Sequence, residues 1–323
     1  MTDSSIWDRY WQFDRIASCF DDAGAHNYDE VVSGGWRDFF GSLPAGSAIL
    51  DLCTGNGAIA IMAAEASARL GRGFAVTAVD RAAIDPRRYV TRHREALAAI
   101  DFRPGTDAAA LPFAERSFGA VVSQYGIEYT DLPRAAAELA RVVAPEGRVR
   151  LVVHAADGKV AEVSRRAIAE ADFMLDEVRL SDAARACFVA TAAAERTSPG
   201  SPEARTEARA RLAAFEGALR QVGERIPAAA DPANLRNAGA TLLDAFNRRG
   251  TLALEELIAV ADRVKIENEA HRGRLAALVA SALSAEQAGD LATRLRGHGA
   301  ATAATAPLHA GEALIGHVIE ARF

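Results

Sequence analysis

The feature that most constrains this chain is a short glycine turn between an apolar run and a helix-forming run. The apolar segment Ala48-Ile-Leu-Asp51 ends in an acid, and Gly55 and Gly57 follow it closely. Residues 58–70 then have the composition of a helix. This order predicts a strand, a tight turn and a helix, which together open a nucleotide-binding βαβ unit. Because glycine has no Cβ, a ligand can approach the turn closely and bind the free N–H groups at the helix N-terminus.

Two kinds of cofactor fit this turn. The spacing Gly55-x-Gly57-x-x-Ala60 matches the dinucleotide pattern, and Asp80 follows 23 residues after Gly57. Asp51 favours a different ligand, because a carboxylate at the strand end repels a pyrophosphate but attracts a cationic amino-acid group. NAD and S-adenosylmethionine (SAM) therefore both remain open on the turn alone, with the acid favouring SAM.

The overall composition narrows the class of protein without naming a function. The 323 residues carry a net charge of −6 and have no 18-residue apolar run, so we expect neither a nucleic-acid partner nor a membrane span. Cys19, Cys53 and Cys187 lack the spacing of a metal site or a disulfide framework. The first residues lack the pattern of a signal peptide, so we expect a cytoplasmic protein without a bound metal.

Beyond the turn, strands and helices alternate along the chain. Further strands are predicted at 73–80, 100–103, 118–124 and 148–154, with helices at 86–99 and 132–143. Strands that alternate with helices indicate an α/β fold with a doubly wound, mostly parallel, Rossmann-like sheet.

Four ordered segments make the pattern specific. Asp51-x-Cys53-x-Gly55-x-Gly57 resembles the first motif of class I SAM-dependent methyltransferases, with Cys53 in place of a glycine. The segments from Asp107 to Phe118 and from Ala137 to Gly147 are similar to those of the subgroup that includes ubiquinone and menaquinone biosynthesis enzymes. NAD enzymes do not carry this series. The resemblance covers about residues 25–155 and implies SAM as the cofactor.

The resemblance also implies where the parts of the cofactor bind. The methionine part is held by an acid and by the glycine turn, that is by Asp51, Cys53, Thr54, Gly55, Asn56 and Gly57. The ribose hydroxyls bind Asp80, and Arg81 flanks the adenine. The adenine amino group donates to Asp107, with the Ala108 backbone beside it.

At the methyl-donating end, the resemblance places Gln124 and Tyr125, which leave the fourth strand. Tyr28 covers the cofactor carboxylate or simply packs. His154, at the end of the fifth strand, is the best-placed candidate for a general base, since imidazole titrates near neutral pH. His26 and Glu128 are weaker alternatives for this role, and a merely structural role for His154 also stays open.

After the fifth strand the alternation stops. Residues 157–297 are rich in Ala, Arg, Leu and Glu, and helices are predicted at 164–178, 202–222, 233–246, 253–278 and 285–296. Strand character returns at 305–308 and 313–323, and in the family two final strands, the last antiparallel, complete a seven-stranded sheet. We therefore expect an N-terminal helical cap (1–45), a SAM-binding core (46–156), a helical insertion (157–297) and C-terminal strands (298–323). The insertion is either a substrate lid or an oligomerisation surface, for instance of a homodimer.

These inferences predict a SAM-dependent methyltransferase that acts on a small, hydrophobic or aromatic acceptor. The segment Ser123-Gln-Tyr-Gly126 stands where methyltransferases of adenine in DNA or of glutamine in proteins carry an Asn-Pro-Pro-Tyr type loop. Two alternatives stay open: a SAM-binding protein that does not methylate, and a methyltransferase whose insertion docks a protein or RNA. The acceptor atom is left open.

Overall fold

The computed structural model describes residues 3–17, 27–28, 30–196 and 201–323. The chain forms two compact units. The first unit comprises residues 1–161 and 278–323, and the second comprises residues 162–277.

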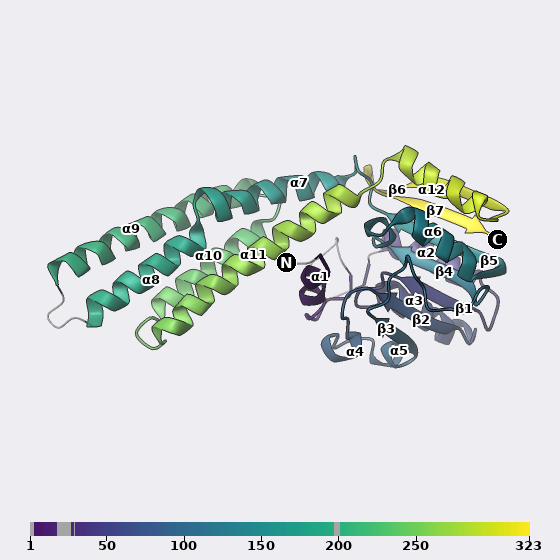
Figure 1. The fold of residues 1–323 in the computed structure, drawn as a ribbon, viewed down its shortest axis with the longest axis horizontal. Coiled ribbons are helices and arrows are strands. Elements are labelled where there is room, and N and C mark those ends of the chain that lie inside the picture. Colours follow the sequence, from purple (N-terminus) through teal and green to yellow (C-terminus); the bar gives the residue numbers. More distant parts are fainter. Residues whose placement is uncertain (1–2, 18–26, 29, 197–200) are drawn as a thin grey trace. The chain divides into compact units, whose positions relative to one another are not determined.

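The first unit is built around a seven-stranded sheet with the order β3-β2-β1-β4-β5-β7-β6 (Figure 1). Its strands are β1 (Ala48–Leu52), β2 (Ala75–Asp80), β3 (Ile100–Pro104), β4 (Phe118–Gln124), β5 (Val143–Val153), β6 (Thr302–Ala310) and β7 (Ala313–Arg322). Strands β1 to β5 pair in parallel, whereas β7 is antiparallel to both β5 and β6. The predicted Rossmann-like sheet with an antiparallel last strand is confirmed.

The strand order places a crevice at the end of β1. The chain leaves β1 towards β2 and β3, and it later returns on the other side of β1 as β4. Asp51, near the end of β1, lies level with Ala78 of β2 and Val122 of β4. Ligands of open α/β sheets bind at such a topological switch point, outside the carboxyl ends of the strands.

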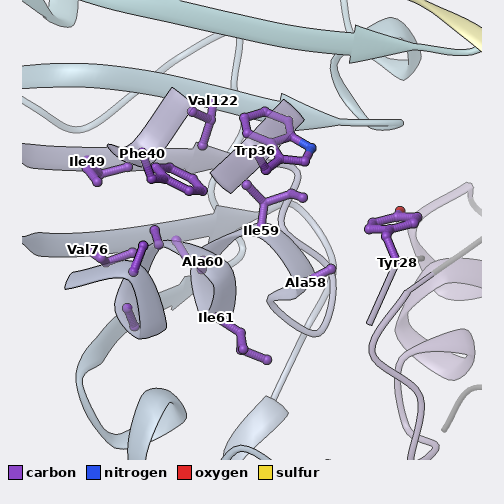
Figure 2. Packing of buried hydrophobic residues seen from close by; sticks show 14 of the residues in the cluster. Tyr28, Trp36, Phe40, Ile49, Ala58, Ile59, Ala60, Ile61, Val76 and Val122 are labelled. Carbon is purple, nitrogen blue, oxygen red and sulfur yellow. The ribbon is translucent and has the colours of Figure 1, made fainter. Parts of the chain in front are cut away.

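Two hydrophobic cores cover the two faces of this sheet. Neighbouring strand residues point to opposite faces, so Ile49 enters one core and Leu50 the other. On the face of Ile49, Trp36 and Phe40 stack with ring centroids 5.7 Å apart, and Figure 2 shows them near Ile49. Helices α2 (Glu30–Gly41) and α3 (Ala58–Leu70) pack on this face, and α6 (Leu132–Val142) and α12 (Ala285–Gly297) pack on the other.

The helix predicted over 86–99 is interrupted. It forms two short helices, α4 (Pro86–Tyr89) and α5 (Arg94–Ala98). Val90 is extended, and His93 has a left-handed backbone with φ 54°. Asp14 accepts hydrogen bonds from the backbone N–H and the hydroxyl of Thr91 at 3.1 and 2.6 Å, which satisfies the interrupted segment. The N-terminal helix α1 (Asp3–Tyr10) precedes this contact in the chain.

The second unit is helical (Figure 1). Its helices are α7 (Lys159–Asp172), the π-turn Phe173–Glu177, α8 (Leu180–Arg196), α9 (Pro202–Arg225), the 3₁₀ turn Ile226–Ala228, α10 (Pro232–Asn247) and α11 (Leu254–Ser281). Phe188, Phe215 and Leu242 are buried in its own hydrophobic core. Helix α8 was not among the predicted elements, since its many alanines give no clear apolar stripe.

The unit boundaries differ from the expected insertion at its C-terminal end. Helix α12 was expected inside the insertion, but it belongs to the first unit. Leu291 and Leu295 of this helix are buried in the sheet core together with Leu139 of α6. Burial of this apolar face against the sheet explains why α12 is not part of the helical unit. No helix in the described ranges is long and apolar enough to cross a membrane.

Candidate functional site

Asp51 is the buried acid at the end of β1. Its carboxylate accepts hydrogen bonds from the Thr54 hydroxyl and from the Ala60 backbone N–H, the latter at 3.1 Å. Burial raises the pKa of Asp51 to about 7, and the nearby charge of Asp80 acts in the same direction. Asp51 thus links the glycine turn to the first turn of helix α3. Its raised pKa means that a neighbouring cation would favour its ionised form.

The turn itself depends on left-handed backbone. Cys53, Gly55 and Gly57 have φ values of 55°, 54° and 89°. A Cβ on Gly57 would lie 3.0 Å from the ring of Phe102, and one on Gly55 would overlap the ring of Trp11. Both glycines are therefore required by close approach as well as by conformation.

Asp80 links the end of β2 to the glycine turn. Its two oxygens accept hydrogen bonds from the backbone N–H groups of Gly55 and Ala82, each at 2.8 Å. Burial raises the pKa of Asp80, although these two bonds and the Arg81 guanidinium oppose that effect.

A cavity of about 200 Å³ lies at this edge of the sheet. Its lining comes from the N-terminal segment, the ends of β2 and β4 and the loops after β3 and β4: Trp7, Trp11, Cys53, Asp80, Arg81, Ala82, Thr106, Asp107, Ala108, Ala109, Tyr125, Gly126, Tyr129, Thr130, Asp131 and Arg134. The cavity therefore lies outside the carboxyl ends of the strands, where ligands of open α/β sheets bind.

A smaller cavity of about 20 Å³ adjoins the buried acid. It is lined by Trp11, Ile16, Tyr28, Asp51, Cys53, Thr54, Ala58, Ile59, Gln124 and Tyr125. Trp11, Cys53 and Tyr125 line both cavities, so the two meet at these side chains.

The loop that carries Asp107 and Ala108 is held from helix α6. Asp107 accepts a hydrogen bond from the Ala109 N–H at 2.8 Å, so it caps its own turn while it lines the large cavity. Glu138 accepts from the Leu111 N–H at 2.7 Å, and Arg141 donates to the carbonyl oxygen of Leu111 at 3.0 Å. The segment between β3 and β4 that suggested the family is thereby fixed as one cavity wall.

Gln124 and Tyr125 occupy the end of β4, as predicted. The Trp36 indole donates to Gln124 Oε1 at 2.7 Å, which fixes the amide beside the small cavity. Tyr28 is buried and meets Tyr125 edge to face, with centroids 6.1 Å apart.

Comparison with known proteins agrees with this geometry. Residues 49–147 match the family described as "Methyltransferase domain". A 2-phytyl-1,4-naphtoquinone methyltransferase of Thermosynechococcus vestitus is 31% identical over 147 residues, which cover 43% of this chain and 61% of that protein. A demethylmenaquinone methyltransferase of Renibacterium salmoninarum is 36% identical over 148 residues, covering 42% of this chain and 57% of that protein. Residues 49–147 form a methyltransferase domain.

The methyltransferase domain accounts for only part of the chain, and the matched region spans about three fifths of these curated relatives. Among solved structures, the geranyl diphosphate C-methyltransferase of Streptomyces coelicolor A3(2) is 18% identical, covering 48% of this chain and 66% of that chain, with a TM-score of 0.34. A score this low carries no argument, so the fold assignment rests on the strand order.

The N-terminal segment of the first unit makes contacts that were not predicted from the sequence. The Asn56 side chain donates to the carbonyl oxygens of Trp11, Phe13 and Arg15 at 3.1, 3.3 and 2.8 Å. Asp8 accepts from the Ala83 N–H at 2.7 Å. The residue types of 3–17 do not predict these hydrogen bonds, because the groups that Asn56 binds in this segment are backbone carbonyl oxygens.

His154 lies next to the domain's cavities but lines neither of them. Its side chain is fully buried, and its Nδ1 lies 2.8 Å from Glu128 Oε1. The ring stacks on Tyr125 with centroids 4.1 Å apart and an interplanar angle of 18°. His26, the other histidine considered, and Cys19 lie outside the described residues.

Proposed function

We propose that this protein is a SAM-dependent methyltransferase with a small-molecule acceptor. One observation carries the proposal: Asp51, the left-handed glycine turn and Asp80 converge at the topological switch point, within the matched residues 49–147. Convergence of two buried acids on a glycine turn at this crevice suits a nucleoside that carries a cationic amino-acid group.

The residues present fit SAM. Each oxygen of Asp80 accepts one backbone hydrogen bond, which leaves capacity for the ribose hydroxyls. Asp107 and the Ala108 backbone line the same cavity and suit the adenine. Asp51 faces the small cavity and would neutralise the cofactor's ammonium group, with the backbone of residues 53–57 beside it.

Bound SAM supplies a methyl group on a positively charged sulfur, and the thioether that leaves needs no proton. The side chains therefore have to hold the acceptor in line and exclude water, which can supply several kcal/mol. Where the acceptor loses a proton, a base must touch it. The predicted base His154 lines neither cavity, because its ring is buried between Glu128 and Tyr125; we do not assign it that contact.

For the acceptor we propose a quinone-type small molecule. Two curated relatives are named as a 2-phytyl-1,4-naphtoquinone methyltransferase and a demethylmenaquinone methyltransferase. The large cavity has an aromatic wall, with Trp7, Tyr125 and Tyr129 in its lining, and Trp7 and Tyr129 meet edge to face at 5.4 Å. Such a wall suits a flat ring.

The test is transfer of isotopically labelled methyl from SAM to a reduced 1,4-naphthoquinone that carries an isoprenoid chain. We expect labelled product and S-adenosylhomocysteine in equal amounts. Binding of SAM without transfer to this quinol or to a metabolite extract would favour a non-methylating SAM-binding protein. Label found in protein or RNA from an extract would favour a macromolecular acceptor.

We further propose that the helical unit mediates a homodimer. Its surface exposes Val189 of α8, Leu243 of α10 and Ile266 of α11, each about two fifths exposed. Sedimentation equilibrium tests this: replacing all three by Gln should shift a dimer to a monomer, whereas a wild-type monomer at all concentrations would contradict it.

A further inference from the structure

Tyr125 is the side chain at which the two cavities meet. It follows directly after β4 and lines both cavities, together with Trp11 and Cys53. Its backbone is left-handed with φ 52°, a conformation that a bulky residue rarely adopts. Residues held in such conformations concentrate at functional sites, where the surrounding structure imposes them.

Four contacts hold this tyrosine. Its N–H donates to the Val152 carbonyl oxygen at 2.7 Å, and its hydroxyl donates to the Ile315 carbonyl oxygen at 3.3 Å. The Tyr28 ring meets it edge to face, and the His154 imidazole stacks on it. The ring therefore has one face against His154 and cannot rotate freely.

The stacked imidazole is itself fixed by a buried carboxylate. Glu128 Oε1 lies 3.0 Å from the His154 backbone N and 2.8 Å from its Nδ1. Both residues are at least nine-tenths buried, and Glu128 Oε2 has no hydrogen-bond partner among the described residues. Such a pair is an inefficient stabiliser, because its desolvation offsets its attraction. A role at the adjoining site explains its presence better than stability does.

We propose that the Glu128–His154 pair positions the Tyr125 ring so that it makes a cation–π contact, here called the sulfonium seat, with the positively charged sulfur of SAM. This inference rests on the proposed function. A cation is attracted to the face of an electron-rich ring, and the attraction grows when water is excluded. A carboxylate hydrogen-bonded to the stacked imidazole adds negative charge behind the ring. His154 is thus a positioning residue that acts through Tyr125, not a base that touches the acceptor.

The proposal separates SAM from its neutral product. S-adenosylhomocysteine shares every group of SAM except the methyl and the positive charge on sulfur. A residue that only maintains the fold should affect both ligands equally, whereas a sulfonium seat should affect SAM alone. The ratio of the two dissociation constants, measured by calorimetry, therefore reports the seat without any acceptor.

We expect Tyr125→Leu and His154→Ala to lower the preference for SAM over S-adenosylhomocysteine by about 3- to 30-fold, the range of a cation–π contact. The double variant Glu128→Gln/His154→Phe keeps a flat ring behind Tyr125 without a buried unpaired charge. It should retain most of the preference. His317→Ala is the matched control, because His317 is a buried histidine on β7, opposite Val153, that lines neither cavity.

Parallel weakening of both ligands in Tyr125→Leu would overturn the inference and leave the proposed function intact. An unchanged ratio in His154→Ala would overturn the positioning role. If instead the wild-type protein binds neither ligand, the proposed function itself fails. Thermal unfolding of each variant verifies that it is folded. If His154→Ala is unfolded, the double variant is measured in its place, and a preference as low as that of Tyr125→Leu would overturn the claim that a stacked ring positions Tyr125.

Discussion

The backbone N–H of Gly55 donates a hydrogen bond to Asp80 Oδ2 at 2.8 Å, which joins the turn after β1 to the end of β2. Asp80 therefore shapes the glycine turn in addition to offering acceptors to a ribose. Since Gly55 has a left-handed backbone, this bond is one of the contacts that fix the conformation of the turn.

Asp80→Asn should weaken SAM binding about 10- to 100-fold, because the amide loses the charge that strengthens hydrogen bonds from hydroxyl and N–H groups. Calorimetry with SAM measures this. Asp101→Asn is the control, since Asp101 is an exposed acid on the neighbouring strand β3 that lines neither cavity. Equal affinities of the Asp80 variant and wild type would contradict the ribose assignment.

Asp51 predicts a pH dependence of SAM binding. Its pKa in the free protein is raised to about 7 by burial, so the carboxyl is protonated below that pH. The ammonium of SAM binds the ionised form, so the affinity should fall as pH decreases below about 7, by up to about tenfold per pH unit. Asp51→Asn should bind SAM weakly with a flat profile between pH 5 and 8. A wild-type affinity that is constant over this range would refute the assignment.

Trp11 predicts a kinetic effect. Its ring lies where a Cβ on Gly55 would be, so it covers the face of the turn that a cofactor must approach. Trp11→Ala should therefore accelerate SAM association several-fold in stopped-flow measurements, and SAM binding should change the wild-type tryptophan emission. Phe13→Ala, at an exposed position of the same segment, serves as control. Slower association of the Trp11 variant would mean that the indole is part of the binding surface.

Asn56 predicts the local stability of the N-terminal segment. Its amide donates to three carbonyl oxygens of that segment, each bond contributing about 1 kcal/mol. Asn56→Ala should therefore make trypsin cleavage at Arg9 and Arg15 faster by about tenfold or more, with a smaller change in global unfolding. Asn247→Ala, at an exposed position at the end of α10, should leave cleavage unchanged. Unchanged proteolysis of the Asn56 variant would show that other contacts hold the segment.

The sheet was predictable from sequence because each of its central strands is a short apolar run that ends in a polar residue or a turn. Asp51 and Asp80 could be assigned for the same reason: their positions follow from where buried strands end. Asp107 required the family resemblance, since an exposed loop acid has no periodicity of its own.

The remaining parts of the site depend on contacts between distant segments. The Glu128–His154 pair joins residues 26 positions apart, and Asn56 binds carbonyls more than 40 positions away. The sequence shows that Asn56 can donate hydrogen bonds. It does not show which residues accept them, because every residue has a backbone carbonyl oxygen. The break at His93 was missed for a similar reason, because Asp14 satisfies the interrupted segment from outside the local sequence.

The most direct test of the account is calorimetric titration of the wild-type protein with SAM and, separately, with NADH at pH 8, where Asp51 is ionised. The account predicts saturable binding of SAM at one site per chain and no binding of NADH. Binding of NADH without binding of SAM would contradict it.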